Sequence, residues 1–188
     1  MTGQRAARRE RTLEVEPLGP GRFRFTADLT DRSVGGDHEP PSPTAVIHDF
    51  RVTGEVEGPE LRITALTVEA LTHPYPQCPF ILPTCDDLVG ACLTSGWRAT
   101  VLERLRGTAG CTHVVSLLLG LTELTTLTFF LTINESVPYG PEQRADGRWM
   151  AIGLAAVPTL AGACHVLAED GPLLARAHSH GGTGNPDT

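Results

Sequence analysis

The chain has 188 residues, of which 40% are hydrophobic and 20% charged, values typical of a globular domain with one core. Its formal net charge is −7 at pH 7, and an acidic chain without a basic stripe argues against nucleic-acid binding. All 15 basic residues are arginines, so catalysis through a Schiff-base lysine is excluded.

The ends of the chain differ in character from its body. Residues 1–10 are expected to form a disordered N-terminus, residues 11–176 a single α+β domain, and residues 177–188 a disordered tail. The N-terminus lacks the apolar stretch of a secretory signal, so we expect a cytoplasmic protein. An odd number of cysteines, five, favours reduced thiols over a disulfide framework.

The first part of the chain has the period-2 pattern of strands. Residues 12–31 predict a β-hairpin around the turn "LGPGR". A loop rich in proline and glycine follows at residues 32–44. The runs "AVIHDFRVTGEVE" and "ELRITALTVEAL" then predict a second strand pair joined at Gly58-Pro59.

The later part of the chain has helical patterning. The segment "THPYPQCPFILPTC" should be irregular, and helices are expected at about 85–106 and 111–134, with a break at Gly96 as the alternative to one continuous first helix. The segment "WMAIGLAAVPTLAGACHVL" fits either a short strand or a helix interrupted at Pro158. Strands followed by helices predict the α+β class, an antiparallel β-meander of four or five strands with helices packed on one face.

The apolar stretch Val114–Ile133 is long enough in principle to span a bilayer. It contains Glu123 and several threonines, and no aromatic belt brackets it. We therefore interpret it as a buried helix and expect no membrane partner.

Histidine, cysteine, aspartate and tyrosine side chains gather near four predicted element ends. They are His48 with Asp49, Tyr75 with Cys78, Cys111 with His113, and Cys164 with His165. None of these pairs has the spacing of a C-x₂-C zinc motif. Cys111 lies at a predicted helix start, where the helix dipole favours a thiolate, although a cysteine there can also serve only as a small buried hydrophobe.

The ordered motifs "VIHDFRVTGEVEG", "PYPQC", "GCTH" and "CHVLAEDGP" resemble an uncharacterised bacterial family, a domain of unknown function, over roughly residues 11–174. The family implies no activity. The resemblance does imply that several reactive residues belong to one shared pattern. These residues are His48, Asp49, Cys78, Cys111, His113, Cys164 and His165.

The order of elements also resembles that of iron–sulfur cluster scaffold proteins. In those proteins a cysteine motif opens a β-meander, a second cysteine follows the sheet, and a His-Cys pair starts a later helix. Here His48 replaces the first cysteine, and the last pair reads Cys111-Thr112-His113. With two scaffold-like thiolates left, the resemblance favours a mononuclear site with mixed ligands over cluster assembly.

The leading hypothesis is a small zinc- or iron-dependent enzyme, a lyase, hydrolase or isomerase acting on a small carbonyl or organic-acid substrate. Its metal ligands would be drawn from His48, Cys78, Cys111 and His113. Asp49, His113 and Tyr75 would supply acid–base chemistry. We expect the ends of the strands, loop and helix that carry these residues to converge at one end of the sheet.

Two alternatives stay open. The first is a metal-independent enzyme with Cys111 as nucleophile and His48 as its partner, because residues i and i+2 of a regular helix, such as Cys111 and His113, face apart. The second is an accessory binding module whose structural metal ties the sheet to the helices. The substrate, the pathway, the metal and the oligomeric state are not indicated by the sequence.

Overall fold

The computed structural model describes residues 6–34, 45–136 and 140–181. The chain forms two compact units, Met1–Thr125 and Thr126–Thr188. The first unit contains a sheet and short helices, and the second is helical.

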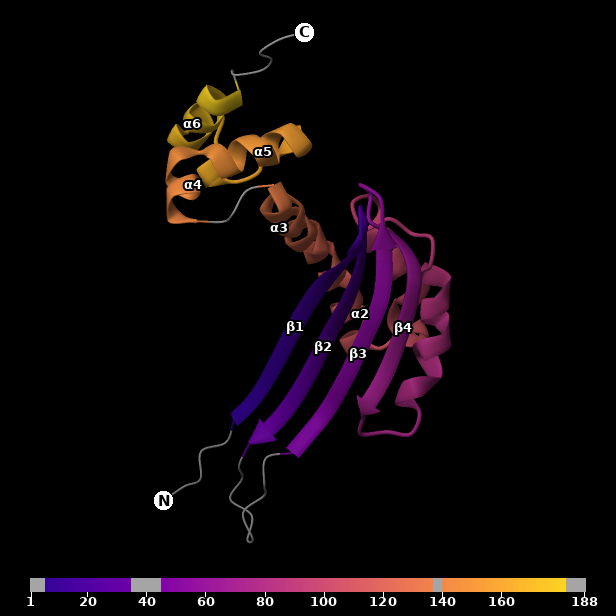
Figure 1. Ribbon diagram of the computed structural model, residues 1–188. Coiled ribbons are helices and arrows are strands. Elements are labelled where there is room, and N and C mark those ends of the chain that lie inside the picture. Colours follow the sequence, from indigo (N-terminus) through magenta and orange to yellow (C-terminus); the bar gives the residue numbers. More distant parts are fainter. Residues whose placement is uncertain (1–5, 35–44, 137–139, 182–188) are drawn as a thin grey trace, which may run out of the picture. The chain divides into compact units, whose positions relative to one another are not determined.

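The sheet of the first unit is a four-stranded antiparallel meander in the order β1-β2-β3-β4 (Figure 1). Its strands are β1 (Ala6–Gly19), β2 (Arg22–Val34), β3 (Ala45–Glu57) and β4 (Arg62–Thr72). The predicted antiparallel meander and the α+β class are confirmed.

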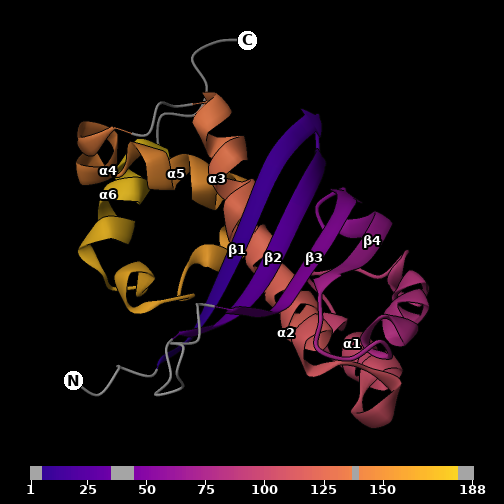
Figure 2. The ribbon, with the colours of Figure 1, turned by 90° about the horizontal axis from the view of Figure 1, so that it is seen from below.

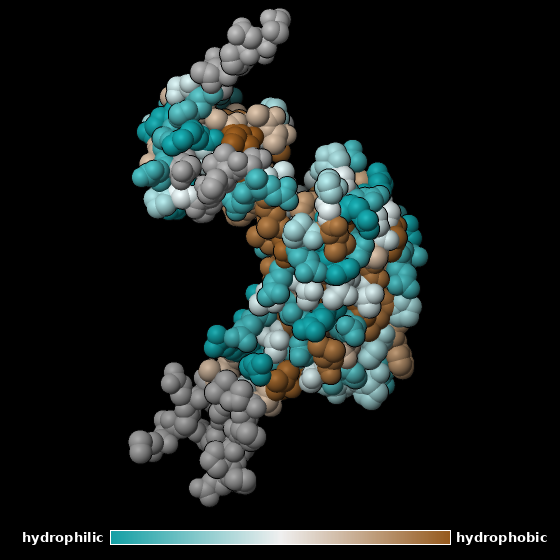
Figure 3. Space-filling model, in the orientation of Figure 1, coloured by the Kyte–Doolittle hydropathy of each residue, from teal (hydrophilic) through white to brown (hydrophobic). Residues whose placement is uncertain are grey.

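The two faces of the sheet differ because side chains alternate along each strand. The inner face carries Phe25, Leu29, Phe50 and Val52, each no more than 1% exposed. The outer face carries ion pairs such as Arg51 Nε–Asp28 Oδ1 at 2.7 Å. In Figure 3 the side of the sheet that faces the viewer is mostly hydrophilic or neutral, with scattered hydrophobic side chains.

The helical segments of the first unit lie against the inner face (Figures 1 and 2). They are η1 (Cys78–Leu88), α1 (Trp97–Leu105), η2 (Gly107–Ala109), α2 (Thr112–Gly120) and η3 (Leu121–Glu123). Helix α2 contacts β2 and β3, and η1 contacts β4. The indole Nε1 of buried Trp97 donates a 2.7 Å hydrogen bond to the carbonyl of Leu118, which joins α1 to α2.

The first predicted α-helix, 85–106, is wrong in its first half. Between η1 and α1 the chain pairs with β4 instead, through hydrogen bonds from Ile63 N to Ala91 O and from Gly90 N to Ile63 O. Gly90 and Gly96 have positive φ angles of 91° and 68°, which interrupt a right-handed helix. The second predicted helix, 111–134, is present as the successive segments α2, η3 and α3 (Leu124–Ser136).

The ordered elements also extend beyond the predicted domain boundaries. Strand β1 begins at Ala6 and pairs with β2 along residues that we expected to be disordered. Charged side chains there find partners, since Arg8 pairs with Glu10 at 2.8 Å and Arg9 with Asp31 at 2.6 Å. Helix α6 continues to Gly181, while residues 1–5 and 182–188 of the expected disordered ends lie outside the described residues.

The second unit packs around Trp149. Besides most of α3, it contains α4 (Pro141–Asp146), α5 (Arg148–Ala156), η4 (Pro158–Leu160), η5 (His165–Leu167) and α6 (Pro172–Gly181). The Trp149 ring meets Phe129 edge-on at 5.8 Å, and its Nε1 donates to Asn134 Oδ1 at 3.2 Å. The segment that fitted either a strand or an interrupted helix is thus helical, and its α-helix ends before Pro158.

In the described residues, one helical run, Thr112–Glu135, is long and apolar enough to cross a membrane. Core helices of soluble proteins share these properties, so the run is weak evidence for a span.

Candidate functional site

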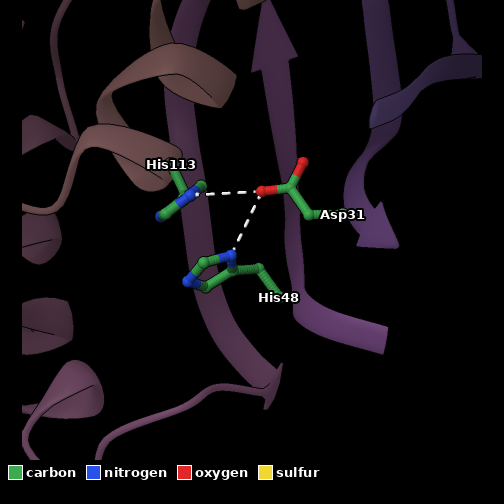
Figure 4. Close-up of side chains that lie close together, drawn as sticks. All are labelled: Asp31, His48 and His113. Atoms are coloured by element: carbon green, nitrogen blue, oxygen red, sulfur yellow. Dashed lines mark hydrogen bonds and ion pairs between the residues drawn. The ribbon is translucent and has the colours of Figure 1, made fainter. Parts of the chain in front are cut away.

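Three potential metal ligands meet at one end of the first unit's sheet (Figure 4). Asp31 comes from β2, His48 from β3 and His113 from the first turn of α2. One donor atom from each of the three side chains lies within 4.8 Å of the other two. Asp31 Oδ2 is 3.1 Å from His48 Nδ1 and 3.2 Å from His113 Nε2.

Strand pairing places the first two residues side by side. Asp31 and His48 are direct cross-strand partners. Both side chains continue the inner-face series, Asp31 two residues after Leu29 and His48 two residues before Phe50. The apolar core therefore ends in a polar pair, and the sheet fixes its position.

His113 covers this pair from the helix side. Its ring lies 3.8 Å from the His48 ring and 5.7 Å from the Phe50 ring, nearly parallel to the latter. Burial lowers the pKa of His113, as does the nearby His48, whereas the Asp31 carboxylate acts in the opposite direction. The net lowering favours the neutral imidazole, the form that binds metals or accepts a proton.

Arg9 holds the carboxylate of Asp31 from β1. Its Nε and Nη2 donate to Oδ1 and Oδ2 at 2.6 and 2.8 Å, a two-point ion pair. This hydrogen bonding lowers the pKa of Asp31 despite the opposing effect of burial, so Asp31 is a carboxylate at neutral pH. The Asp31 side chain is 18% exposed and that of Arg9 is 47% exposed.

Cys111 contacts the remaining ring nitrogen of His113, with Sγ 3.4 Å from Nδ1. We expected residues two apart to face away from each other on a helix. Cys111 is instead the N-cap of α2, with extended backbone at φ −115° and ψ 133°, so it lies outside the regular helix. Cys111, His113 and Asp31 therefore form a continuous chain of polar contacts.

The other predicted site residues are not members of this group of candidate ligands. Asp49 is on the outer face of the sheet, where its Oδ1 accepts a hydrogen bond from Thr30 Oγ1 at 3.2 Å. Cys78 starts η1 half-buried, and Tyr75 is 68% exposed in the preceding loop. Neither belongs to the group of described candidate ligands. Cys164 and His165 are exposed residues of the second unit.

Sequence reasoning missed Asp31 and Arg9. A signal for Asp31 was available, because the buried series Phe23, Phe25, Ala27 and Leu29 places position 31 on the same inner face. A carboxylate that continues an apolar series needs a partner there. Arg9 was overlooked because it lies in the segment that was expected to be disordered.

The described cysteines differ in accessibility, and this predicts their reactivity. Burial raises the pKa of the Cys85 thiol to about 11, with smaller contributions from Asp86 and Cys111, and the residue is 1% exposed. Cys164 is exposed. Iodoacetamide at neutral pH should label Cys164 within minutes and Cys85 only after unfolding, as peptide mass spectrometry would detect. Labelling of Cys85 in the native protein at a rate similar to that of Cys164 would contradict the described core.

The sequence matches the family described as "Protein of unknown function (DUF2889)" over residues 7–126. The match covers more than half of the chain, and the chain belongs to this family. The matched range includes Arg9, Asp31, His48, Cys111 and His113. No curated protein and no solved structure matches the chain significantly.

Proposed function

We propose that the protein is a small metal-dependent enzyme whose ligands are Asp31, His48 and His113. The observation that carries the proposal is the convergence of one carboxylate and two imidazoles, from three separate elements, within 4.8 Å. A zinc ion about 2.0–2.2 Å from each donor needs donors within about 4.4 Å of one another, which a small side-chain rotation achieves.

The donor chemistry fits zinc or ferrous iron. Two histidines and one carboxylate recur in catalytic zinc sites and in non-haem iron sites, and three protein ligands leave positions open for water or substrate. The surrounding contacts resemble those that orient metal ligands. Arg9 binds the carboxylate, and Cys111 contacts His113 Nδ1, which fixes the ring with Nε2 toward the other donors.

Such a metal would polarise a substrate carbonyl or supply hydroxide, which suits a lyase, hydrolase or isomerase acting on a small carbonyl or organic-acid substrate. The three ligand side chains are 17–19% exposed at the end of the sheet, and a small substrate would reach the metal through this exposed part. The proposal keeps the resemblance to iron–sulfur scaffold proteins in the order of the reactive residues, since His48 lies near the start of β3 and Cys111 and His113 lie at the start of α2. The family motif pattern was expected to continue through "CHVLAEDGP", beyond the matched residues 7–126, and this continuation is part of the proposal.

Metal content tests the proposal directly. Untagged protein, purified without chelators, should contain about one zinc or iron per chain by elemental mass spectrometry. Dialysis against a chelator should remove the metal, and one equivalent should restore it. Protein that is free of metal and takes up none from micromolar zinc or anaerobic ferrous iron would contradict the proposal.

A second candidate function is thiol catalysis without a metal. The observation that favours it is the chain from Cys111 Sγ through His113 to Asp31, with contacts of 3.4 and 3.2 Å. In this arrangement His113 Nδ1 accepts the thiol proton, Cys111 becomes the nucleophile, and Asp31 orients the imidazole. His113, and not the predicted His48, would be the partner of Cys111.

A further inference from the structure

We propose that Arg9 binds the negatively charged group of the substrate, which makes a small carboxylic acid the substrate class. This inference rests on the proposed metal site and deepens it. Arg9 and the two histidines all contact the same atom, Asp31 Oδ2.

Oδ2 of Asp31 is crowded in the described structure. Arg9 Nη2 lies 2.8 Å from it, His48 Nδ1 3.1 Å and His113 Nε2 3.2 Å. A cation bound by the two histidines and Asp31 would take this oxygen and compensate its charge. Arg9 would keep its 2.6 Å bond from Nε to Oδ1, and its guanidinium has further N–H donors that the two contacts with Asp31 do not use.

The position of Arg9 suits a role in binding. Its side chain points to the inner face from β1, an edge strand of the sheet, and is 47% exposed. A guanidinium offers several N–H donors in one plane and binds a carboxylate at two points. The group therefore has both solvent access and donors to spare once the metal shares the charge of Asp31.

The charge around the loaded site also favours an anion. The combined positive charge of a divalent cation and Arg9 would exceed the single negative charge of Asp31. Asp49, the nearest acidic residue in sequence to His48, lies on the opposite face with Thr30. Arg11, also on the inner face of β1, adds a second positive charge while it donates to the Ser116 carbonyl at 3.0 Å. A net positive, partly desolvated site attracts carboxylates.

The test uses full-length protein loaded with Co²⁺, whose visible spectrum reports new ligands, titrated with lactate and with the neutral analogue lactamide. Wild-type protein should bind lactate with a spectral change and lactamide at least about tenfold more weakly, because only lactate offers a charged group. Arg9→Met should keep cobalt and lose about tenfold or more in lactate affinity. Arg9→Lys should be intermediate, since an ammonium keeps the charge without the two-point geometry.

Arg8→Met is the matched control, because Arg8 is the preceding residue of β1, points to the outer face and pairs with Glu10. It should bind lactate like wild type. Equal lactate affinity in Arg9→Met and wild type, or equal binding of lactamide, would overturn the role of Arg9 while leaving the metal site in place. Failure of the wild-type protein to take up cobalt would overturn both proposals. If Arg9→Met does not retain cobalt, the lactate affinities of Arg9→Lys and Arg8→Met are compared instead. Weaker lactate binding by Arg9→Lys supports the role of Arg9, and equal binding by the two variants overturns it.

Discussion

Replacing His113 with alanine should lower the affinity for zinc by more than about 100-fold, because loss of a mere partner of a ligand already costs about 10–100-fold. His113 supplies one of three candidate donors and is the only one on α2 among the described ligands. Competition with a chromophoric chelator would measure the change. Circular dichroism of the same samples would show whether the fold is intact.

A second variant separates the two candidate functions. His48→Ala should lower zinc affinity to a similar extent, since His48 Nδ1 is also a donor. It should leave the contact between Cys111 and His113 in place. His113→Ala removes both a metal donor and the contact with Cys111. If alkylation of Cys111 slows in His113→Ala alone, and neither variant alters metal binding, the thiol mechanism holds and the metal site fails. His165→Ala, an exposed histidine of the second unit, is the control and should behave as wild type.

A large loss of stability is expected from Phe25→Ala. Phe25 is 1% exposed, lies on β2, and its ring covers Gly54 of the neighbouring strand, its cross-strand partner. Truncation of a buried phenylalanine costs about 3–5 kcal/mol, since both the transfer energy and the contacts around the new cavity are lost. Urea unfolding followed by circular dichroism would measure the difference in free energy of unfolding.

Phe80→Ala is the matched control, because the same side chain is 75% exposed at Phe80. Its free energy of unfolding should stay within about 0.5 kcal/mol of wild type. Similar costs for Phe25→Ala and Phe80→Ala would contradict the assignment of Phe25 to the core. They would equally contradict the inward orientation of the alternating residues of β2.

The sheet was largely predictable because its signal is local. Alternation in residues such as Phe23, Phe25, Phe50 and Val52 identifies β2 and β3 and which side of each is buried. The segment 85–96 was not predictable in the same way. Its apolar spacing suits a helix, but hydrogen bonds to Ile63, about thirty residues earlier in the chain, determine its conformation. Periodicity carries no information about such a tertiary pairing.

The site was predictable in part for a related reason. Histidine and cysteine attract attention as residue types, and His48, Cys111 and His113 were found in this way. Asp31 and Arg9 are common surface residues, and only the register of β1, β2 and β3 brings them to His48. Asp49 was misplaced because adjacent residues of a strand point to opposite faces, so it could not accompany His48.

The division of the donors between sheet and helix has a thermodynamic consequence. Two donors belong to the sheet and the third to α2, so a ligand held by all three binds only when the helix is docked on the sheet. Binding and docking are then linked equilibria. A ligand at about 100 times its dissociation constant would add about 2.7 kcal/mol to the free energy of unfolding. The free energy of unfolding would therefore depend on whether the site is occupied, and it would rise with the concentration of the ligand.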